Sequence, residues 1–315
     1  MDVIVIGCGV SGLSCGIRLL ERGFSVTIVA EQLPPHTTSD VAPAFWYPFK
    51  AFPLKRIQRW GQVSLAEFYR LMAVPEAGVA AATLVEFYPT PPSPSWWAGL
   101  VRHYELIPAS EVPPGYQAGY RAETPLIETP RYMPYLLARF GQLGGQVEQK
   151  RITHLSELAG PGRLIVNCSG VGAREIAGDE EVYPIRGQIV RVRQPGLDRQ
   201  IVNALSGPAL TYIVPRSQDC VLGGTAEEHS WSLTPEPATA AAIMQRAQGL
   251  MPALAGAEVL EHRVGLRPGR REVRLELERL GPDCAVIHNY GHGGAGFTLS
   301  WGCAQEVAEL AAKVA

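Results

Sequence analysis

The chain lacks the features that mark membrane, nucleic-acid and metal-binding proteins. Its 315 residues include no apolar run near the roughly 18 residues that a membrane-spanning helix needs. No long basic segment occurs, and 28 Lys and Arg against 30 Asp and Glu give a formal net charge of −2. The six cysteines form no C-x-x-C pair, and the start MDVIVIGCG does not resemble a signal peptide. We therefore expect a cytoplasmic protein with free thiols, no metal site, and no membrane or nucleic-acid partner.

The composition and the spacing of apolar residues indicate an α/β protein. Hydrophobic residues make up 46% of the chain and charged residues 18%, which supports a large packed core. The start of the chain predicts a strand at 3–6, a helix at 10–22 and a strand at 25–29, which form a βαβ unit. Further helices are expected at 54–72, 132–143, 236–250 and 299–312, and further strands at 162–170, 188–193, 211–216, 220–224 and 272–280.

The parallel sheet would then be assembled from early, middle and late segments of the chain. We predict an α/β fold in which a Rossmann-like domain of βαβ units comprises residues 1–50, 132–185 and 281–315. A second, mixed-sheet α+β domain comprises residues 51–131 and 186–280. Both domains are discontinuous in sequence.

The string GCGVSG, from Gly7 to Gly12, predicts a dinucleotide site because it lies between a strand and a helix. Gly7 permits the tight turn, Gly9 lets the backbone approach a pyrophosphate, and Gly12 allows the helix to pack on the strand. Glu31 follows Gly12 by 19 residues and could accept hydrogen bonds from ribose hydroxyls, which disfavours NADP. The alternative is a glycine-rich turn with a solvated Glu. The pattern does not separate FAD from NAD, but a single motif suits an oxidase.

One arginine of a basic stretch stands in unusual surroundings. Residues 263–279 hold six arginines, most of which read as strand-borne surface ion pairs. Arg267 differs because its context, VGLRPG, is apolar and rich in glycine. A buried guanidinium needs an anionic partner, and a substrate carboxylate can supply it in a bidentate pair.

The segment NYGHGGAGFT, residues 289–298, has four glycines between an expected strand and an expected helix. Such a loop brings backbone groups to a ligand, and a cradle for a phosphate or a flavin pyrimidine is one reading. A simple connector is the other. His292 in this loop is more readily explained as a structural histidine than as a catalytic one.

These motifs, in this order, resemble the D-amino-acid oxidase family over nearly the whole chain. The matching segments are VIGCGVSGLS, HTTSDVA, LIVNCSG, RGQIV, TYIVP, VGLRP and VIHNYGHGGAGFTLSWGCA. The resemblance implies non-covalently bound FAD in the first domain and a substrate-binding second domain. It implies oxidation of neutral or hydrophobic D-amino acids by hydride transfer to the flavin, with O2 as acceptor. The products would be 2-oxo acids, ammonia and hydrogen peroxide.

The resemblance also assigns roles to individual residues. Arg267 and Tyr212 would bind the substrate carboxylate, and the carbonyl of Gly294 would accept a hydrogen bond from the substrate amine. The cofactor would contact residues of seven short segments, namely Gly7, Gly9, Val10, Ser11, Gly12, Glu31, Thr37, Thr38, Ser39, Ala44, Phe45, Tyr47, Ile152, Ser169, Gly170, Gly293, Gly294, Ala295, Gly296, Phe297 and Thr298.

The sequence departs from vertebrate members of this family in the expected lid. Pro208 stands where they carry a second active-site tyrosine, and the connection at 195–210 is shorter. Gln32 follows Glu31 where the family has an arginine, and Ala295 replaces a tyrosine. These changes suggest a more open pocket.

Several alternatives stay open on the sequence alone. A D-aspartate oxidase would need a second cation, for which Arg216 is a candidate because it lies four residues after Tyr212. A glycine or sarcosine oxidase shares the fold, with Cys303 as the attachment point if the flavin were covalent. A binding protein with a vestigial nucleotide site is the non-enzymatic reading. A homodimer and a disulfide between Cys220 and Cys284 are also left open.

Overall fold

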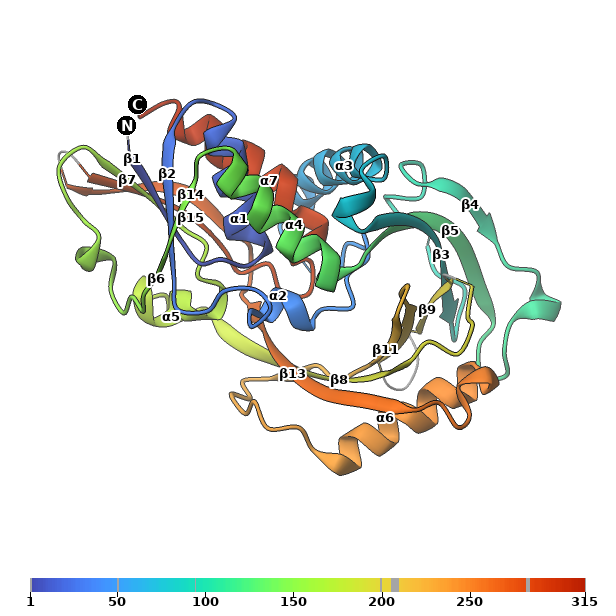
Figure 1. Ribbon diagram of the computed structural model, residues 1–315. Coiled ribbons are helices and arrows are strands. Elements are labelled where there is room, and N and C mark those ends of the chain that lie inside the picture. The colour runs from blue at the N-terminus through green and yellow to red at the C-terminus, as the bar shows by residue number, and fades with distance from the viewer. Residues whose placement is uncertain are drawn as a thin grey trace. The chain divides into compact units, whose positions relative to one another are not determined.

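The computed structural model describes residues 2–49, 51–93, 95–198, 200–204, 210–281 and 284–314 (Figure 1). Pro208, the proposed substitute for a lid tyrosine, lies outside the described residues. The chain divides into two compact units. The first unit comprises Met1–Val79, Thr129–Ile185 and Arg267–Ala315, and the second comprises Ala80–Glu128 and Arg186–Leu266.

The first unit is built on a six-stranded sheet in the order β14-β15-β7-β1-β2-β6. Five neighbouring strands run parallel, and the edge strand β14 pairs antiparallel with β15. The apolar, β-branched run of β1 is buried on both faces, as expected of a central parallel strand. The strands are β1 (Asp2–Ile6), β2 (Ser25–Ala30), β6 (Gln146–Gln149), β7 (Arg163–Asn167), β14 (Arg274–Gly281) and β15 (Cys284–Tyr290).

Helices α1 (Val10–Leu20), α4 (Thr129–Gln142) and α7 (Gly296–Ala311) pack together in the first unit, and α3 (Leu54–Leu71) packs on α7 (Figure 1). Helix α1 is buried along almost its whole length because the sheet covers one side and α4 and α7 cover the other. The remaining short helices are α2 (Thr38–Val41), η1 (Pro75–Ala77), η3 (Leu155–Glu157), η4 (Gly170–Gly172) and α5 (Ala173–Ile176).

The first unit includes two segments that the sequence analysis placed in the second domain. Helix α3 joins the first unit because Gly302 of α7 fits closely against Trp60, where a Cβ would lie 2.2 Å from the Trp60 carbonyl oxygen. The Gly302 N–H also donates to the Ser64 hydroxyl at 3.0 Å. Strand β14 joins because its ladder with β15 extends the parallel sheet.

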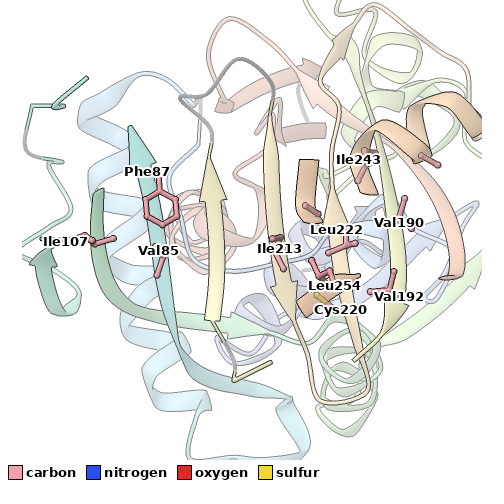
Figure 2. Close-up of a cluster of buried hydrophobic side chains, with 12 residues drawn as sticks. Val85, Phe87, Ile107, Val190, Val192, Ile213, Cys220, Leu222, Ile243 and Leu254 are labelled. Atoms are coloured by element: carbon pink, nitrogen blue, oxygen red, sulfur yellow. The ribbon is translucent and has the colours of Figure 1, made fainter. Parts of the chain in front are cut away.

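The second unit is built on a nine-stranded mixed sheet in the order β12-β8-β11-β10-β9-β3-β5-β4, with β13 paired to β8. Its core lies between the sheet and α6 (Pro237–Leu250), where Ile243 packs with Val190, Ile213 and Leu222 (Figure 2). The strands are β3 (Val79–Tyr88), β4 (Arg102–Leu106), β5 (Ala118–Ile127), β8 (Tyr183–Arg193), β9 (Gln200–Ala204), β10 (Thr211–Pro215), β11 (Asp219–Gly223), β12 (Glu227–Glu228) and β13 (Val259–Gly269), with η2 (Ala109–Glu111) and η5 (Pro252–Leu254) beside them.

The six cysteines are all free thiols. Cys220 lies within β11 and Cys284 begins β15, and the structure forms no disulfide between them. The question left open by the sequence is thus decided against a Cys220–Cys284 disulfide, and the two residues belong to the sheets of different units. In the part of the chain that the structure describes, no helix combines the length and the apolar character needed to cross a bilayer.

Candidate functional site

The turn between β1 and α1 leaves no room for side chains at two of its glycines. Gly7 has a φ of +100°, and a Cβ on it would lie 2.6 Å from the Cys168 carbonyl oxygen. A Cβ on Gly12 would lie 1.9 Å from the Gly7 carbonyl oxygen. Gly9 precedes α1 without a side-chain cap. The helix thus starts directly beyond the strand, which is the arrangement that binds a pyrophosphate.

A second predicted segment, Thr37–Ser39, lies against this turn. The Val10 N–H donates to the Ser39 hydroxyl at 2.9 Å, which brings the polar loop to the first turn of α1. Thr37 caps α2, because its hydroxyl and its N–H both donate to the Asp40 carboxylate, at 2.6 and 3.0 Å. The loop is therefore fixed in place, and its threonine and serine groups gather at one helix N-terminus.

Residues after β7 close the other side of the turn. The Ser169 hydroxyl and N–H donate to the Asn167 side-chain oxygen at 2.6 and 3.2 Å, and Gly170 follows with a φ of +59°. The Nδ2 group of Asn167 is fully buried and has no hydrogen-bond partner among the described residues. An unpaired buried donor beside the glycine turn fits a site that is completed by a ligand.

Two predicted cofactor residues differ in their surroundings. Glu31 is exposed directly after β2, and its backbone carbonyl accepts a hydrogen bond from Gln149 at 3.1 Å. Its carboxylate is thus available to ribose hydroxyls. The Ile152 side chain is buried in an apolar cluster with Ile6 and Val29, so a polar contact at this position would have to come from its backbone.

The aromatic segment 44–47 is joined to the start of α7. The Tyr47 N–H donates to the Thr298 hydroxyl at 3.1 Å, and that hydroxyl donates back to the Tyr47 carbonyl at 2.8 Å. Ala44 has a φ of +48°, which is uncommon outside glycine and marks a sharp bend before Phe45. The two segments that were expected to meet the flavin ring are therefore brought together in the first unit.

The glycine loop before α7 lies close to side chains of two other segments. A Cβ on Gly294 would lie 2.7 Å from the Phe49 ring, and a Cβ on Gly296 would lie 3.9 Å from a Val10 methyl group. The loop therefore meets the first turn of α1. Ala295, Phe297 and Thr298 are buried, whereas Gly294 is exposed.

Arg267 lies at the end of β13 beside the same loop. The Gly293 N–H donates to the carbonyl of Pro268 at 2.8 Å, which fixes the residue next to Arg267 against the glycines. A Cβ on Gly269 would lie 2.7 Å from the Tyr183 ring, so the segment also packs closely on β8. The Arg267 side chain is half-buried. Arg267 and Gly294, both predicted to bind substrate, are thus neighbours in the first unit.

His292 is buried and its pKa is lowered to about 4 by the loss of solvent around the ring. Its Nε2 atom lies 3.1 Å from the side-chain oxygen of Asn289, and this contact requires the ring nitrogen to donate. The imidazole is therefore neutral at pH 7 and supports the loop. This agrees with the structural reading of His292.

Tyr212 lies on β10 in the second unit. Its ring is buried against Gly223, the last residue of β11, and Gly224, the residue after it. A Cβ on Gly223 would lie 1.9 Å from the tyrosine Cζ, and a Cβ on Gly224 would lie 2.7 Å from its hydroxyl oxygen. The ring therefore has little freedom to move. Its hydroxyl position is set by backbone on the neighbouring strand.

Arg216, the candidate second cation, already has a carboxylate partner. It is 4% exposed, and its Nε and Nη2 atoms donate to the two Asp219 oxygens at 2.6 and 2.7 Å. Arg191 donates to the same carboxylate at 2.7 Å. Burial by itself would raise the pKa of the Asp219 carboxyl, but the hydrogen bonds and charges of these arginines hold it below its usual value.

The first-unit segments form a surface that fits a dinucleotide. They combine close-packed glycines, a helix N-terminus, hydroxyl groups, a buried unpaired amide and an exposed carboxylate after the second strand. The chain belongs to the FAD dependent oxidoreductase family, whose sequence model matches residues 2–310. This confirms the family expected from the motifs.

The chain is similar over its length to several curated proteins. It is 52% identical over 309 residues to a D-amino-acid oxidase of Rubrobacter xylanophilus, covering 98% of this chain and 95% of the relative. It is 41% identical to a D-amino-acid oxidase of Streptomyces coelicolor, covering 98% and 96%. It is 36% identical to the D-aspartate oxidase of Homo sapiens, covering 99% and 94%.

The fold matches solved structures of lower sequence identity. Glycine oxidase from Bacillus cereus superposes with a TM-score of 0.81 at 20% identity, covering 99% of this chain and 95% of that structure. Glycine oxidase from Geobacillus kaustophilus gives a TM-score of 0.81 at 18% identity, covering 99% and 94%. These matches confirm the predicted α/β fold class.

The groups that join the residues around Arg267 to the glycine loop carry no motif in the sequence. Arg270 and Tyr290 both donate to the buried Asp179 carboxylate, at 3.0 and 2.8 Å. Arg270 lies within the arginine-rich stretch 263–279, and no motif surrounds Asp179. A lone acidic residue after a short helix carries no local signal, because its partners come from segments about a hundred positions away.

Proposed function

We propose that the chain is an FAD-dependent oxidase of neutral and hydrophobic D-amino acids. The overall reaction converts a D-amino acid, O2 and water into a 2-oxo acid, ammonia and hydrogen peroxide. The observation that carries the proposal is the position of Arg267, one residue from a backbone hydrogen bond to the glycine loop of a FAD-family fold. The 52% identity of the chain to a D-amino-acid oxidase supports the same reaction.

Three contacts would fix the substrate. Arg267 would bind the carboxylate in a bidentate pair, and the hydroxyl of Tyr212, whose ring is held by Gly223 and Gly224, would bind it as well. The carbonyl of Gly294, an exposed residue, would accept a hydrogen bond from the amine. With the carboxylate and the amine both held, only one enantiomer would direct its Cα hydrogen toward the flavin, because the mirror image would direct its side chain there.

The bound FAD supplies the acceptor for the hydride that leaves the substrate Cα. The chain then contributes orientation rather than acid–base chemistry. A substrate that binds with a neutral amine needs no protein base, and the nearby His292 is buried and used for support. Water hydrolyses the resulting imino acid to the 2-oxo acid and ammonia.

The cofactor would be held without a covalent bond. Cys303, the candidate attachment point, is fully buried in α7, and burial raises the pKa of its thiol well above the usual value. A thiol in such surroundings is unreactive. The cytoplasmic location and the homodimer remain predictions.

Two observations support a preference for uncharged side chains. A D-aspartate oxidase needs a cation for the side-chain carboxylate, and Arg216 is bound to Asp219. Phe45 and Tyr47, whose ring centroids lie 6.1 Å apart, provide apolar surface instead.

The test is anaerobic mixing of the purified protein with D-valine, D-aspartate and L-valine while the flavin absorbance is recorded. Bleaching with D-valine and not with L-valine is expected. Bleaching with D-aspartate alone would overturn the substrate class, and no bleaching with any of them would overturn the function.

The variant Arg267→Ala tests the role of the arginine. KM for D-valine should rise by about 100-fold or more and kcat should fall, because the lost charge-assisted bonds also align the substrate. FAD content should stay unchanged. An unchanged KM for D-valine in Arg267→Ala would show that Arg267 does not bind the substrate.

A further inference from the structure

A buried carboxylate joins three segments of the first unit that are far apart in sequence. Asp179 lies after α5 and is 8% exposed. One of its oxygens accepts hydrogen bonds from Tyr290 at 2.8 Å and from the Arg270 Nε at 3.0 Å. Arg274 lies 3.6 Å from the same oxygen, and the other oxygen accepts the Glu181 N–H at 3.1 Å. The carboxylate is thus fully used by the protein.

The partners of Asp179 lie directly next to the substrate-binding segments. Tyr290 ends β15 immediately before the glycine loop. Arg270 lies three residues after Arg267, and residues 267–270 are called the Arg267 segment below. A Cβ on Gly291 would lie 2.8 Å from the Arg270 Cβ, so the loop and the arginine pack in direct contact. The hydrogen bond from Gly293 to Pro268 then links the two segments a second time.

We propose that Asp179, through Arg270 and Tyr290, is the positioning residue that holds the Arg267 segment and the 291–294 loop in register for substrate binding. This rests on the proposed function, in which Arg267 and Gly294 hold the two ends of the substrate. Asp179 does not touch substrate or cofactor. It fixes the spacing between the carboxylate site and the amine site.

The negative charge of Asp179 is needed to hold the arginines that contact it. An asparagine has the same shape and can accept from Tyr290, but it cannot balance Arg270 and Arg274, whose side chains are 16% and 19% exposed. Arg270 would retain one carboxylate partner, the exposed Glu181 at 3.2 Å, and its hydrogen bond to the Glu272 backbone carbonyl at 3.0 Å. The arginine would then turn outward, and the Arg267 segment and Gly291 would lose their common support.

The experiment compares holoenzymes of wild type, Asp179→Asn and the matched control Glu181→Gln. Glu181 pairs with the same arginine but its side chain is 59% exposed. Asp179→Asn should raise KM for D-valine by about tenfold, with a smaller loss of kcat and unchanged FAD content. Glu181→Gln should leave KM within about twofold, because exposed ion pairs contribute little. In an Arg267→Ala background, Asp179→Asn should add little to KM.

Hydrogen exchange of the same holoenzymes supplies a readout that needs no substrate. Residues 267–270 and 291–296 should exchange faster in Asp179→Asn, while 3–20 keep the wild-type rate. Unchanged exchange together with unchanged KM would overturn the proposal, as would uniform acceleration over the whole unit. If the wild type oxidises no D-amino acid, the proposed function fails, and the exchange data still decide whether Asp179 supports the two segments.

Discussion

The two units use polar groups in opposite ways. In the first, the turn after β1 and the loop before α7 present backbone, hydroxyl groups and an exposed Glu31, and glycines keep side chains out of the way. In the second, the buried arginines are neutralised inside the fold, Arg216 by Asp219 and Arg186 by Glu227 at 3.0 Å. The difference teaches that a buried arginine is no sign of a substrate site until its own carboxylate partner has been sought.

The largest effect is expected where the first unit depends on a missing side chain. Gly12→Ala places a Cβ 1.9 Å from the Gly7 carbonyl oxygen, so α1 must move away from the turn. The protein should lose FAD completely on dialysis, as measured by flavin absorbance. Gly141→Ala is the matched control, because it is also a helical glycine with no atom within 4 Å of its Cβ, and it should retain FAD. Retention of FAD by Gly12→Ala would show that close packing at this turn is dispensable.

The second unit can be tested by removing the partner of Arg216. Asp219→Asn leaves a buried guanidinium without its anion and should lower the free energy of unfolding by about 3–5 kcal/mol in denaturant titrations. Glu258→Gln, which breaks the exposed pair with Arg193, should change stability little. The ratio of D-aspartate to D-valine turnover should stay constant in both variants. A higher ratio of D-aspartate to D-valine turnover in Asp219→Asn would show that Arg216 can bind the substrate side chain.

The smallest effect concerns the pH dependence of stability. The folded pKa of His292 is about 4, below its ordinary 6.5, so the unfolded chain takes up a proton first as the pH falls. The contribution of the neutral His292 to the free energy of unfolding is complete above pH 6.5. It falls by about 3 kcal/mol as the pH falls toward 4. His292→Gln should flatten the stability profile in this window. His262→Gln, at an exposed position on β13, should leave the profile unchanged. A steep profile in His292→Gln would assign the loss to other groups.

Local patterns predicted the elements whose residues carry their own signals. The strand at 3–6, the helix from Val10 and the strand from Ser25 all occur, because the apolar spacing and the glycine turn act over a few residues. Helix α7 begins at Gly296 rather than at 299, since packing on α1 overrides the low helix propensity of glycine. Strands β3 and β5 have no predicted counterpart. Strand β3 pairs with the distant β9, whereas β5 pairs with its sequence neighbours β3 and β4.

The sequence by itself determined the family and the glycine turn, because short motifs along the chain carry both, while the individual site residues stay predictions. Only the tertiary structure decided that Ser39 meets Val10, that Arg216 belongs to Asp219, and that Asp179 joins Arg270 to Tyr290. The physical reason is that a charge or a hydroxyl is satisfied by whichever group the fold brings within about 3 Å. Separation along the chain does not limit that choice.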